Sequence, residues 1–168
     1  MIFWTPDFLI NHTGLAPETA SLAMTLFFVA VVVGRAIGSV LARRYRAFYL
    51  LLVAQGIALV GFPFLWLSQT NILTYFGLIL VGLGIANLFP LGLATASTIG
   101  EEQADKASSR ISQAAGMAIL IMPLVLGNVA DQTGIFMAFG FGLVLLIVQP
   151  VIVAYGLYME RASQAAQM

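Results

Sequence analysis

The sequence predicts an all-α membrane protein, a single transmembrane helical domain over residues 1–168 with five spanning helices and an N-terminal helix stub. Hydrophobic residues make up 61% of the chain and charged residues only 8%, whereas soluble domains are about 25% charged. So few charges cannot cover the surface of a water-soluble protein of this size. The apolar residues also form continuous stretches, each long enough for a helix that crosses a bilayer.

The spanning helices are predicted, in order, at residues 21–41, 48–68, 74–97, 110–130 and 135–158. A helix of about 21–24 residues rises about 31–36 Å, which is enough to cross a hydrocarbon core of about 30 Å. Helices are expected because a bilayer has no water to satisfy open backbone groups. The apolar runs are continuous rather than alternating, which argues against a β-barrel.

Composition also narrows the classes of function. The chain has no cysteine and one histidine, so we expect no disulfide, metal site or cofactor. We expect His12 to be solvated in an outer connection. The numbers of basic and acidic residues are equal, at 7 each, which argues against nucleic acid as a partner. Because the motifs of metalloproteases and serine hydrolases are missing, an enzyme is not expected.

The first twenty residues leave two interpretations open. Trp4 and Phe8 suit a headgroup interface, so this segment could be an amphipathic tail. Alternatively, it is the outer end of a spanning helix whose beginning is missing. The segment lacks the basic residues that open a signal peptide. An odd number of spans with an outside N-terminus therefore favours the second interpretation.

The first span carries small residues at a spacing of four: Ala30, Gly34, Gly38 and Ala42. Residues four apart share one face of a helix, and small side chains let a neighbouring helix approach closely. We therefore expect this face to pack against another helix.

Arg35 lies within the same span, and a charge inside a bilayer needs an explanation. Three interpretations are open. Its long side chain reaches the inner interface, it pairs with an acidic residue of the inner connection, or it binds substrate directly. The third is the least favoured, because Arg35 lies away from the bilayer midplane. The acidic candidates are Glu101, Glu102 and Asp105.

The basic residues set the expected orientation. Six of the seven lie on one side of the predicted spans, and the seventh is Arg35. The opposite side carries Asp7, Glu18 and Asp131 without any lysine or arginine. The positive-inside rule then puts the C-terminus in the cytoplasm and the N-terminus outside, in the plasma (inner) membrane. The six basic residues are Arg43, Arg44, Arg46, Lys106, Arg110 and Arg161.

The third span is the first place to look for a substrate site. Asn87 and Pro90 fall near its midpoint. Proline has no N–H and clashes with the carbonyl four residues earlier, so a kink is expected. Interrupted helices at this depth are typical of transporter sites. Asn87 either forms a hydrogen bond to a neighbouring helix or lines a cavity. The small residues at positions 82, 86, 90 and 94 form a further stripe, which is expected to pack against another helix rather than to bind substrate.

The fourth span begins with a polar segment and is interrupted at Pro123. Ser112, Gln113 and Gly116 lie in its inner third. The two polar side chains either form hydrogen bonds within the bundle or line the inner half of a pathway. In the second span, Gln55 is expected to serve packing.

The inner connection, residues 101–106, is expected to be a solvated loop. A second hypothesis makes it half of a latch, in which its acids pair with Arg43, Arg44 and Arg46 in one state and release them in another. Exposed pairs contribute only about 0–1 kcal/mol each, but several together can bias two states.

Three patterns resemble the major facilitator superfamily. Residues 34–46 look like the Gly-Arg-x-x-Gly helix end and basic loop between its eighth and ninth helices. Residues 3–16 are similar to the outer end of its seventh helix. Residues 127–134, which include Asp131, look like the Gly-x-Leu-Ala-Asp-x-x-Gly junction between its eleventh and twelfth. The resemblance covers the chain, but only the C-terminal half of a twelve-helix transporter.

The resemblance implies the C-terminal six-helix bundle of such a permease. It implies secondary transport of a small solute by alternating access, with Asn87 and Gln113 facing the substrate. The partners implied are the lipid bilayer, the solute and a missing N-terminal six-helix bundle. The alternative is a non-transporting membrane scaffold or interaction subunit. Polar groups of the third and fourth spans facing a cavity favour transport, and the same groups turned towards helix contacts favour a scaffold.

Overall fold

The computed structural model describes the backbone of residues 4–96 and 101–166, and the side chains of residues 4–95 and 104–155. Within these ranges the chain is helical and contains no strand. Five segments are long and apolar enough to cross a membrane, which confirms the all-α membrane prediction. The described helices are α1 (Thr5–Thr13), α2 (Pro17–Leu41), α3 (Ala47–Leu67), α4 (Asn71–Ile85), α5 (Leu88–Ala96), α6 (Glu101–Thr133) and α7 (Ile135–Ala166).

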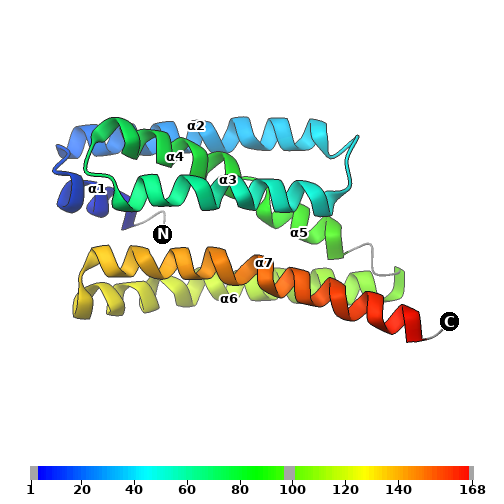
Figure 1. Cartoon of the computed structure of the whole chain (residues 1–168). Coiled ribbons are helices and arrows are strands. Elements are labelled where there is room, and N and C mark those ends of the chain that lie inside the picture. Colours follow the sequence, from blue (N-terminus) through cyan, green and yellow to red (C-terminus); the bar gives the residue numbers. More distant parts are fainter. Residues whose placement is uncertain (1–3, 97–100, 167–168) are drawn as a thin grey trace.

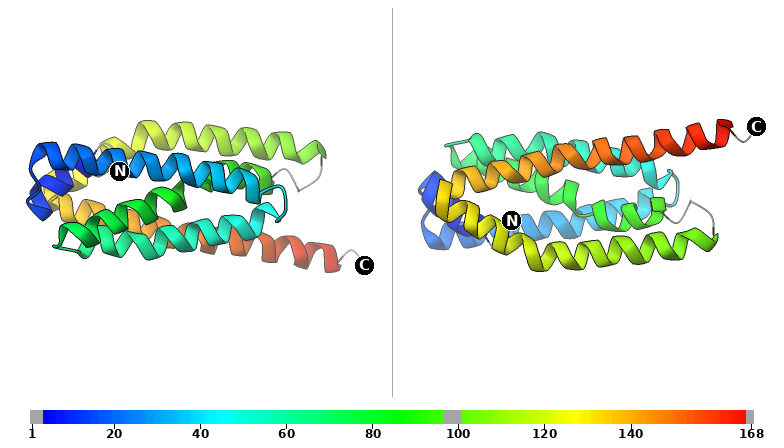
Figure 2. Two further views of the ribbon diagram at one scale, coloured as in Figure 1. Left: turned by 90° about the horizontal axis from the view of Figure 1, so that it is seen from above. Right: turned by 90° about the horizontal axis from the view of Figure 1, so that it is seen from below.

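The helices form two layers that run along one long axis. Figure 1 shows α2, α3 and α4 side by side, with the pair α6 and α7 beneath them. The views from above and below in Figure 2 show the same common axis. Helix α3 packs on α7, and α5 packs on α6, so these two contacts join the layers. The short helix α1 contacts both α2 and α7 at one end.

Helix α4 lies at the centre of the upper layer because glycine lets both neighbours approach it. A Cβ atom at Gly82 would lie 2.9 Å from the carbonyl oxygen of Phe27 and 3.0 Å from the Cβ of Ala30 on α2. A Cβ atom at Gly84 would lie 2.6 Å from the backbone nitrogen of Ala58 on α3. Gly34 likewise would place a Cβ atom 2.9 Å from the carbonyl oxygen of Leu83, so the predicted packing face is confirmed for Ala30, Gly34 and Gly38, whereas Ala42 is exposed.

Several helix boundaries differ from the prediction: α4 begins at Asn71 rather than at residue 74, and α7 continues to Ala166 rather than ending at residue 158. Two further differences, in α2 and α6, bear on the argument. Helix α2 begins at Pro17 rather than at residue 21, because the fixed φ of proline suits a first helical turn. Helix α6 begins at Glu101, so the expected loop over residues 101–106 is wrong. Residues 101–106 are helical and belong to α6 rather than to a connection.

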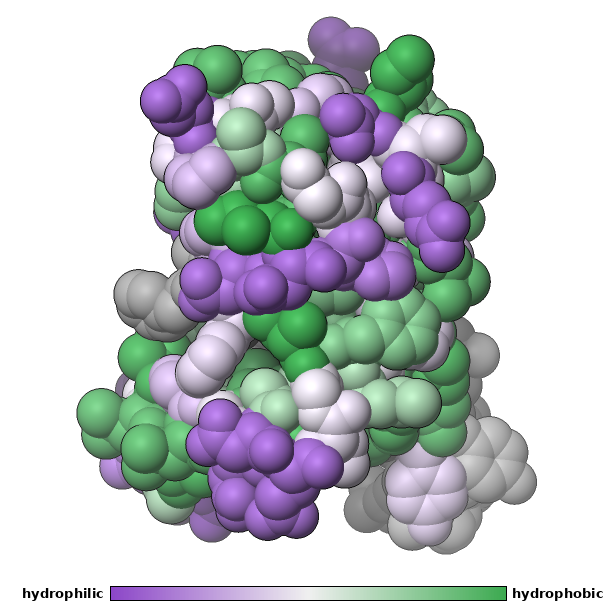
Figure 3. Space-filling view, turned by 90° about the vertical axis from the view of Figure 1, so that its left-hand side faces the viewer, coloured by the Kyte–Doolittle hydropathy of each residue, from purple (hydrophilic) through white to green (hydrophobic). Residues whose placement is uncertain are grey.

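Glycine makes the tight turns at the end of the bundle where α1 lies. Gly14 ends α1 with φ +68°, and Gly134 separates α6 from α7 with φ +88°. Residues with a Cβ atom rarely adopt this left-handed backbone conformation, whereas glycine adopts it without strain. The end-on view in Figure 3 shows hydrophilic residues gathered between apolar ones on this face. The predicted junction over residues 127–134 is therefore the last two turns of α6 followed by a sharp turn at Gly134 into the antiparallel α7.

Candidate functional site

The third spanning segment is interrupted near its middle, as Pro90 predicts. Helix α4 ends at Ile85 and α5 begins at Leu88, so residues 86 and 87 form the break. Proline leaves the carbonyl of the residue four positions earlier without its helical partner, and that residue is Ala86. The break is local, because Asn71–Thr95 is still one segment long enough to cross a membrane, and the amide of Leu91 donates to the carbonyl oxygen of Asn87 at 2.9 Å.

Asn87 lies at this break and is half-buried. Its Nδ2 atom donates a hydrogen bond to the carbonyl oxygen of Gly34 on α2, with an N···O distance of 2.6 Å. A Cβ atom at Gly38 would collide with the Asn87 carboxamide. The amide therefore takes the space that the two glycines of α2 leave open. Asn87 makes a contact between helices and also lines a cavity between α2 and α3.

The polar residues at the start of the fourth span lie on an uncovered face. Ser112, Gln113 and Gly116 are all exposed on α6, and a Cβ atom at Gly116 would meet nothing within 4 Å. Only 6% of the most apolar part of α6 is buried, because α6 packs chiefly on α7 and α5. Pro90 is exposed too, and it lies on α5.

The charged candidates lie towards the two ends of the bundle. Arg35 is exposed on α2, and Arg43, Arg44 and Arg46 are exposed in the connection between α2 and α3. Asp131 is exposed near the end of α6, beside the Gly134 turn. Among the acids of the latch hypothesis, Asp105 is exposed on α6, whereas Glu101 and Glu102 lie outside the residues whose side chains are described.

Gln55, which the sequence predicts to serve packing, makes a buried hydrogen bond with a specific chemical cause. Gln55 of α3 is 2% exposed, and its Nε2 atom donates to the carbonyl oxygen of Leu146 on α7 at 2.9 Å. Residue 150 is proline, so it has no N–H to donate to that carbonyl within α7. Gln55 therefore satisfies an acceptor that Pro150 leaves open. In the sequence, the feature that points to this contact is a single glutamine within an apolar span.

Aromatic side chains join the two layers near α1. Trp66 of α3 donates its indole N–H to the carbonyl oxygen of Phe136 at 2.8 Å and stacks on the Phe136 ring at 5.0 Å. Phe8 of α1 stacks on Phe139 of α7 with ring centroids 4.1 Å apart. These contacts hold α1 and α3 against α7.

His12 is part of the same aromatic cluster, so the expectation of a solvated histidine is wrong. Its ring lies 5.0 Å from both the Phe8 ring and the Phe136 ring. The residue is half-buried, and its Nε2 atom is buried without a hydrogen-bond partner. Sequence position alone pointed to a loop, whereas the packing of α1 on α7 places the ring between aromatic neighbours.

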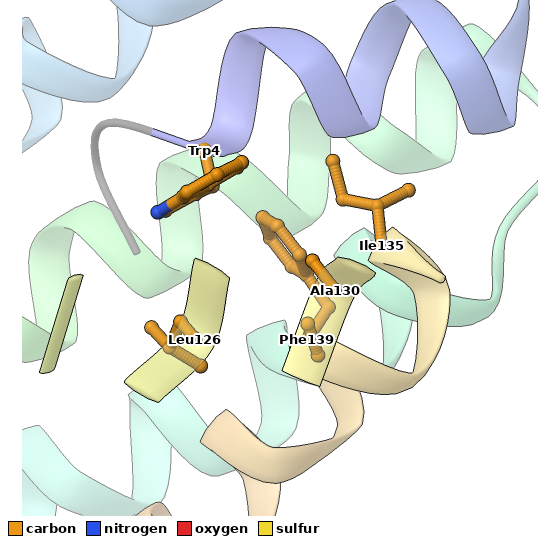
Figure 4. A pocket seen from close by; sticks show the side chains of 6 residues that line it. Trp4, Leu126, Ala130, Ile135 and Phe139 are labelled. Carbon is orange, nitrogen blue, oxygen red and sulfur yellow. The ribbon is translucent and has the colours of Figure 1, made fainter. Parts of the chain in front are cut away.

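Trp4 packs against α6 and α7 rather than standing free at an interface. Figure 4 shows its indole facing Leu126, Ala130 and Phe139 around a small cavity. That cavity has a volume of about 10 Å³, which is too small for a solute. A Cβ atom at Gly127 would lie 3.3 Å from the indole, so glycine makes room for it.

Comparison with known proteins agrees with this architecture. The sequence profile described as Major Facilitator Superfamily matches residues 1–167. An uncharacterized MFS-type transporter of Yersinia pestis is 24% identical over 147 residues, which cover 88% of this chain and 38% of that protein. The glucose/mannose transporter GlcP of Bacillus subtilis is 26% identical over 136 residues, which cover 80% of this chain and 33% of GlcP.

The chain thus spans between a third and two fifths of the length of these curated relatives. No solved structure matches it significantly. The match over nearly all residues agrees with the three sequence patterns and with the five apolar helices. The chain belongs to the Major Facilitator Superfamily, and it is an integral membrane protein of a transporter family rather than an enzyme.

Proposed function

We propose that this chain forms the C-terminal helical bundle of a transporter that moves a small solute by alternating access. Three sequence patterns support this placement, because residues 3–16, 34–46 and 127–134 occur in the order of that half. The share of each relative that the chain covers is also compatible with about half a transporter. A second bundle of six helices, in the same chain or a separate one, would complete the solute site.

The interruption of the third span at residues 86 and 87 is the observation that carries the proposal. Broken helices near the bilayer midplane expose backbone carbonyls and give a transporter bundle a place to bind solute. Asn87 and Pro90 mark this position, and Pro90 is exposed. We propose that the solute pathway passes this break.

The exposed polar face of α6 extends the proposed pathway. Exposing a polar side chain to hydrocarbon costs free energy. Ser112 and Gln113 are therefore expected to face water or protein rather than lipid. Gly116 lies one turn further along the same helix and leaves open space. We propose that the second bundle covers this face and that the solute passes between the two bundles.

Gating in this proposal involves the basic end of the bundle. Gly34 and Gly38 let α2 approach α4 closely, and Arg35 lies beside them. We propose that Arg35, Arg43 and Arg44 exchange acidic partners between two conformations, with Glu101 and Glu102 as partners on α6. Asp131 lies near the opposite end of α6, beside the Gly134 turn, and we propose a structural role for it in that junction.

One contact favours the alternative, a membrane scaffold. Asn87 turns towards Gly34 and forms a bond between helices at 2.6 Å. The other polar candidate, Gln113, is exposed and belongs to the face that α6 leaves uncovered. A scaffold needs only the hydrogen bond between Asn87 and Gly34, whereas a transporter also uses the exposed polar face of α6 that carries Gln113. We therefore retain transport as the proposed function.

Cysteine labelling tests the proposed orientation in the plasma membrane, with the C-terminus in the cytoplasm. The chain has no cysteine of its own, so Tyr45→Cys and Gln69→Cys each introduce one exposed thiol. We expect a membrane-impermeant maleimide to label Gln69→Cys on intact cells and Tyr45→Cys only after permeabilisation. The Tyr45→Cys substitution removes no charge, so all three arginines of the basic loop remain. The reverse pattern of labelling contradicts the orientation.

Uptake measurements test the transport proposal. Glucose and mannose are the first solutes to try, because one relative is a glucose/mannose transporter. The coding DNA upstream of Met1 is sequenced first, and the helices it encodes are expressed with this chain. We expect uptake only from the combination, and Gln113→Ala to lower it roughly two- to tenfold, the cost of one lost hydrogen bond. Gln69→Ala, at an outer turn, serves as the matched control.

The uptake experiment separates the two candidate functions. Uptake by the 168-residue chain alone contradicts the need for a second bundle. A Gln113→Ala variant with the same uptake as the Gln69→Ala control contradicts the pathway along α6. If no solute is moved by the combination while the bundle still binds other membrane proteins, the scaffold replaces the transporter.

A further inference from the structure

A groove opens between α2 and α3 at the end of the bundle that carries the arginines. It has a volume of about 150 Å³, and α4 and α5 form its floor through Leu83, Asn87 and Leu91. Ile37 and Val53 lie on its sides and are 52% and 60% exposed, so the groove is open to the surface. We call this feature the α2–α3 groove.

The lining of the α2–α3 groove is almost entirely apolar. Gly34 and Gly38 line it, and the remaining lining residues apart from Asn87 and Ala54 are leucine, isoleucine and valine. The Asn87 amide already donates to the Gly34 carbonyl. The groove is open to the surface and its lining is almost wholly apolar, so in a bilayer hydrocarbon is the occupant that its chemistry favours.

A basic loop closes one end of the groove. Leu41 and Leu50 both line it, and the connection between them contains Arg43, Arg44 and Arg46, which are all exposed. The sequence has no acidic residue between Glu18 and Glu101. The helices that form the groove offer these three cations no carboxylate near this end, and the acids of the proposed gating pairs lie on α6, which does not line the groove.

Two tyrosines mark the same level of the bundle. Tyr45 lies within the basic loop and Tyr49 on the first turn of α3, and they are 58% and 59% exposed. Exposed tyrosine is enriched where a membrane protein meets the lipid headgroups. The loop that closes the groove therefore lies at the depth where phosphates are found.

We propose that the α2–α3 groove and its basic loop bind an anionic glycerophospholipid. One acyl chain lies in the groove along α2 and α3, and the phosphate accepts hydrogen bonds from the guanidinium groups of the loop. Basic pockets between spanning helices on the cytoplasmic side bind anionic headgroups, and the planar guanidinium matches a phosphate in geometry and charge. The groove reaches the helix break at Asn87, but it opens between α2 and α3, whereas Ser112 and Gln113 of the proposed pathway lie on α6.

The headgroup half of the proposal is tested by native mass spectrometry of the purified 168-residue chain in detergent. Phosphatidylglycerol and phosphatidylcholine with identical acyl chains are titrated against it. We expect the anionic lipid to bind more tightly, and Arg43→Gln/Arg44→Gln to weaken its binding roughly tenfold or more. The control variant Lys106→Gln/Arg110→Gln removes two exposed charges from α6 and is expected to bind as the wild type.

The acyl-chain half is tested by filling the groove. Val53→Trp places a large side chain in the α2–α3 groove and is expected to reduce retention of both lipids. Val60→Trp is the matched control, because Val60 lies two turns further on the same helix and is also 60% exposed. Size-exclusion profiles confirm that both variants fold.

Photocrosslinking identifies the occupant directly in membranes. The photoreactive residue p-benzoylphenylalanine at position 53 is expected to yield an adduct with the mass of a phospholipid. An adduct with a second copy of the chain, or with another polypeptide, overturns the proposal. Equal binding of both lipids by the wild type, or equal loss in the two double variants, overturns it as well. Because the measurement is lipid binding, it is independent of the uptake result.

Discussion

A methyl group added at Gly84 is expected to separate α3 from α4. The new Cβ atom would lie 2.6 Å from the backbone nitrogen of Ala58 and 2.7 Å from the carbonyl oxygen of Ala54. Backbone atoms cannot rotate away as a side chain can, so the two helices must move apart. Overpacking of this kind costs about 1–3 kcal/mol and occasionally more. We expect Gly84→Ala to reach or exceed the upper end of that range.

Reversible unfolding of the purified chain in mixed micelles measures this loss. Gly56→Ala is the matched control, because it adds the same methyl group to α3 where nothing lies within 4 Å. Glycine within a helix is less stable than alanine by about 0.5–1 kcal/mol, so this variant is expected to be unchanged or slightly more stable. If Gly84→Ala unfolds like Gly56→Ala, the close contact between α3 and α4 is refuted.

Replacing Gln55 with leucine is expected to destabilise the contact between the two layers. The Leu146 carbonyl would lose the donor at 2.9 Å, and Pro150 cannot replace it. A buried polar group left without a partner costs about 1–3 kcal/mol. The bilayer makes this loss more severe than water would, because no solvent molecule takes the place of the amide.

The Pro150→Ala change tests the cause of that loss. Alanine restores an N–H at position 150, and this group can donate to the Leu146 carbonyl within α7. We expect the double variant Gln55→Leu/Pro150→Ala to recover most of the stability that Gln55→Leu alone loses. A double-mutant cycle measures the coupling between the two positions. Effects that simply add would mean that Gln55 does not act through the carbonyl that Pro150 leaves free.

The polar contacts in the interior illustrate how far sequence patterns reach. Pro90 predicted an interruption of the third span, and the break at residues 86 and 87 follows from the local chemistry of proline. Pro150 has the same local effect, yet nothing in the sequence indicates that Gln55 supplies the missing donor. The two residues are 95 positions apart, and only the packing of α3 on α7 brings them together.

The candidate site also combines features that the sequence predicts with features that only the packing of the helices decides. Asn87 was expected either to bond to a neighbouring helix or to line a cavity, and it does both, because Gly34 and Gly38 leave space beside it. Its direction depends on the rotation of α4 about its axis, which the glycine contacts with α2 and α3 set. The uncovered state of Gln113 likewise depends on which helices pack on α6, and periodicity does not specify this.

The sequence by itself determined the membrane class, the apolar spans and the small-residue faces, because hydrocarbon thickness and backbone hydrogen bonding leave a chain of this composition few other structures. The tertiary structure decided the rest. It placed His12 between aromatic rings, joined Gln55 to the Leu146 carbonyl and opened the α2–α3 groove beside the arginines. These features depend on how helices rotate and approach one another, and many distant side chains determine that together.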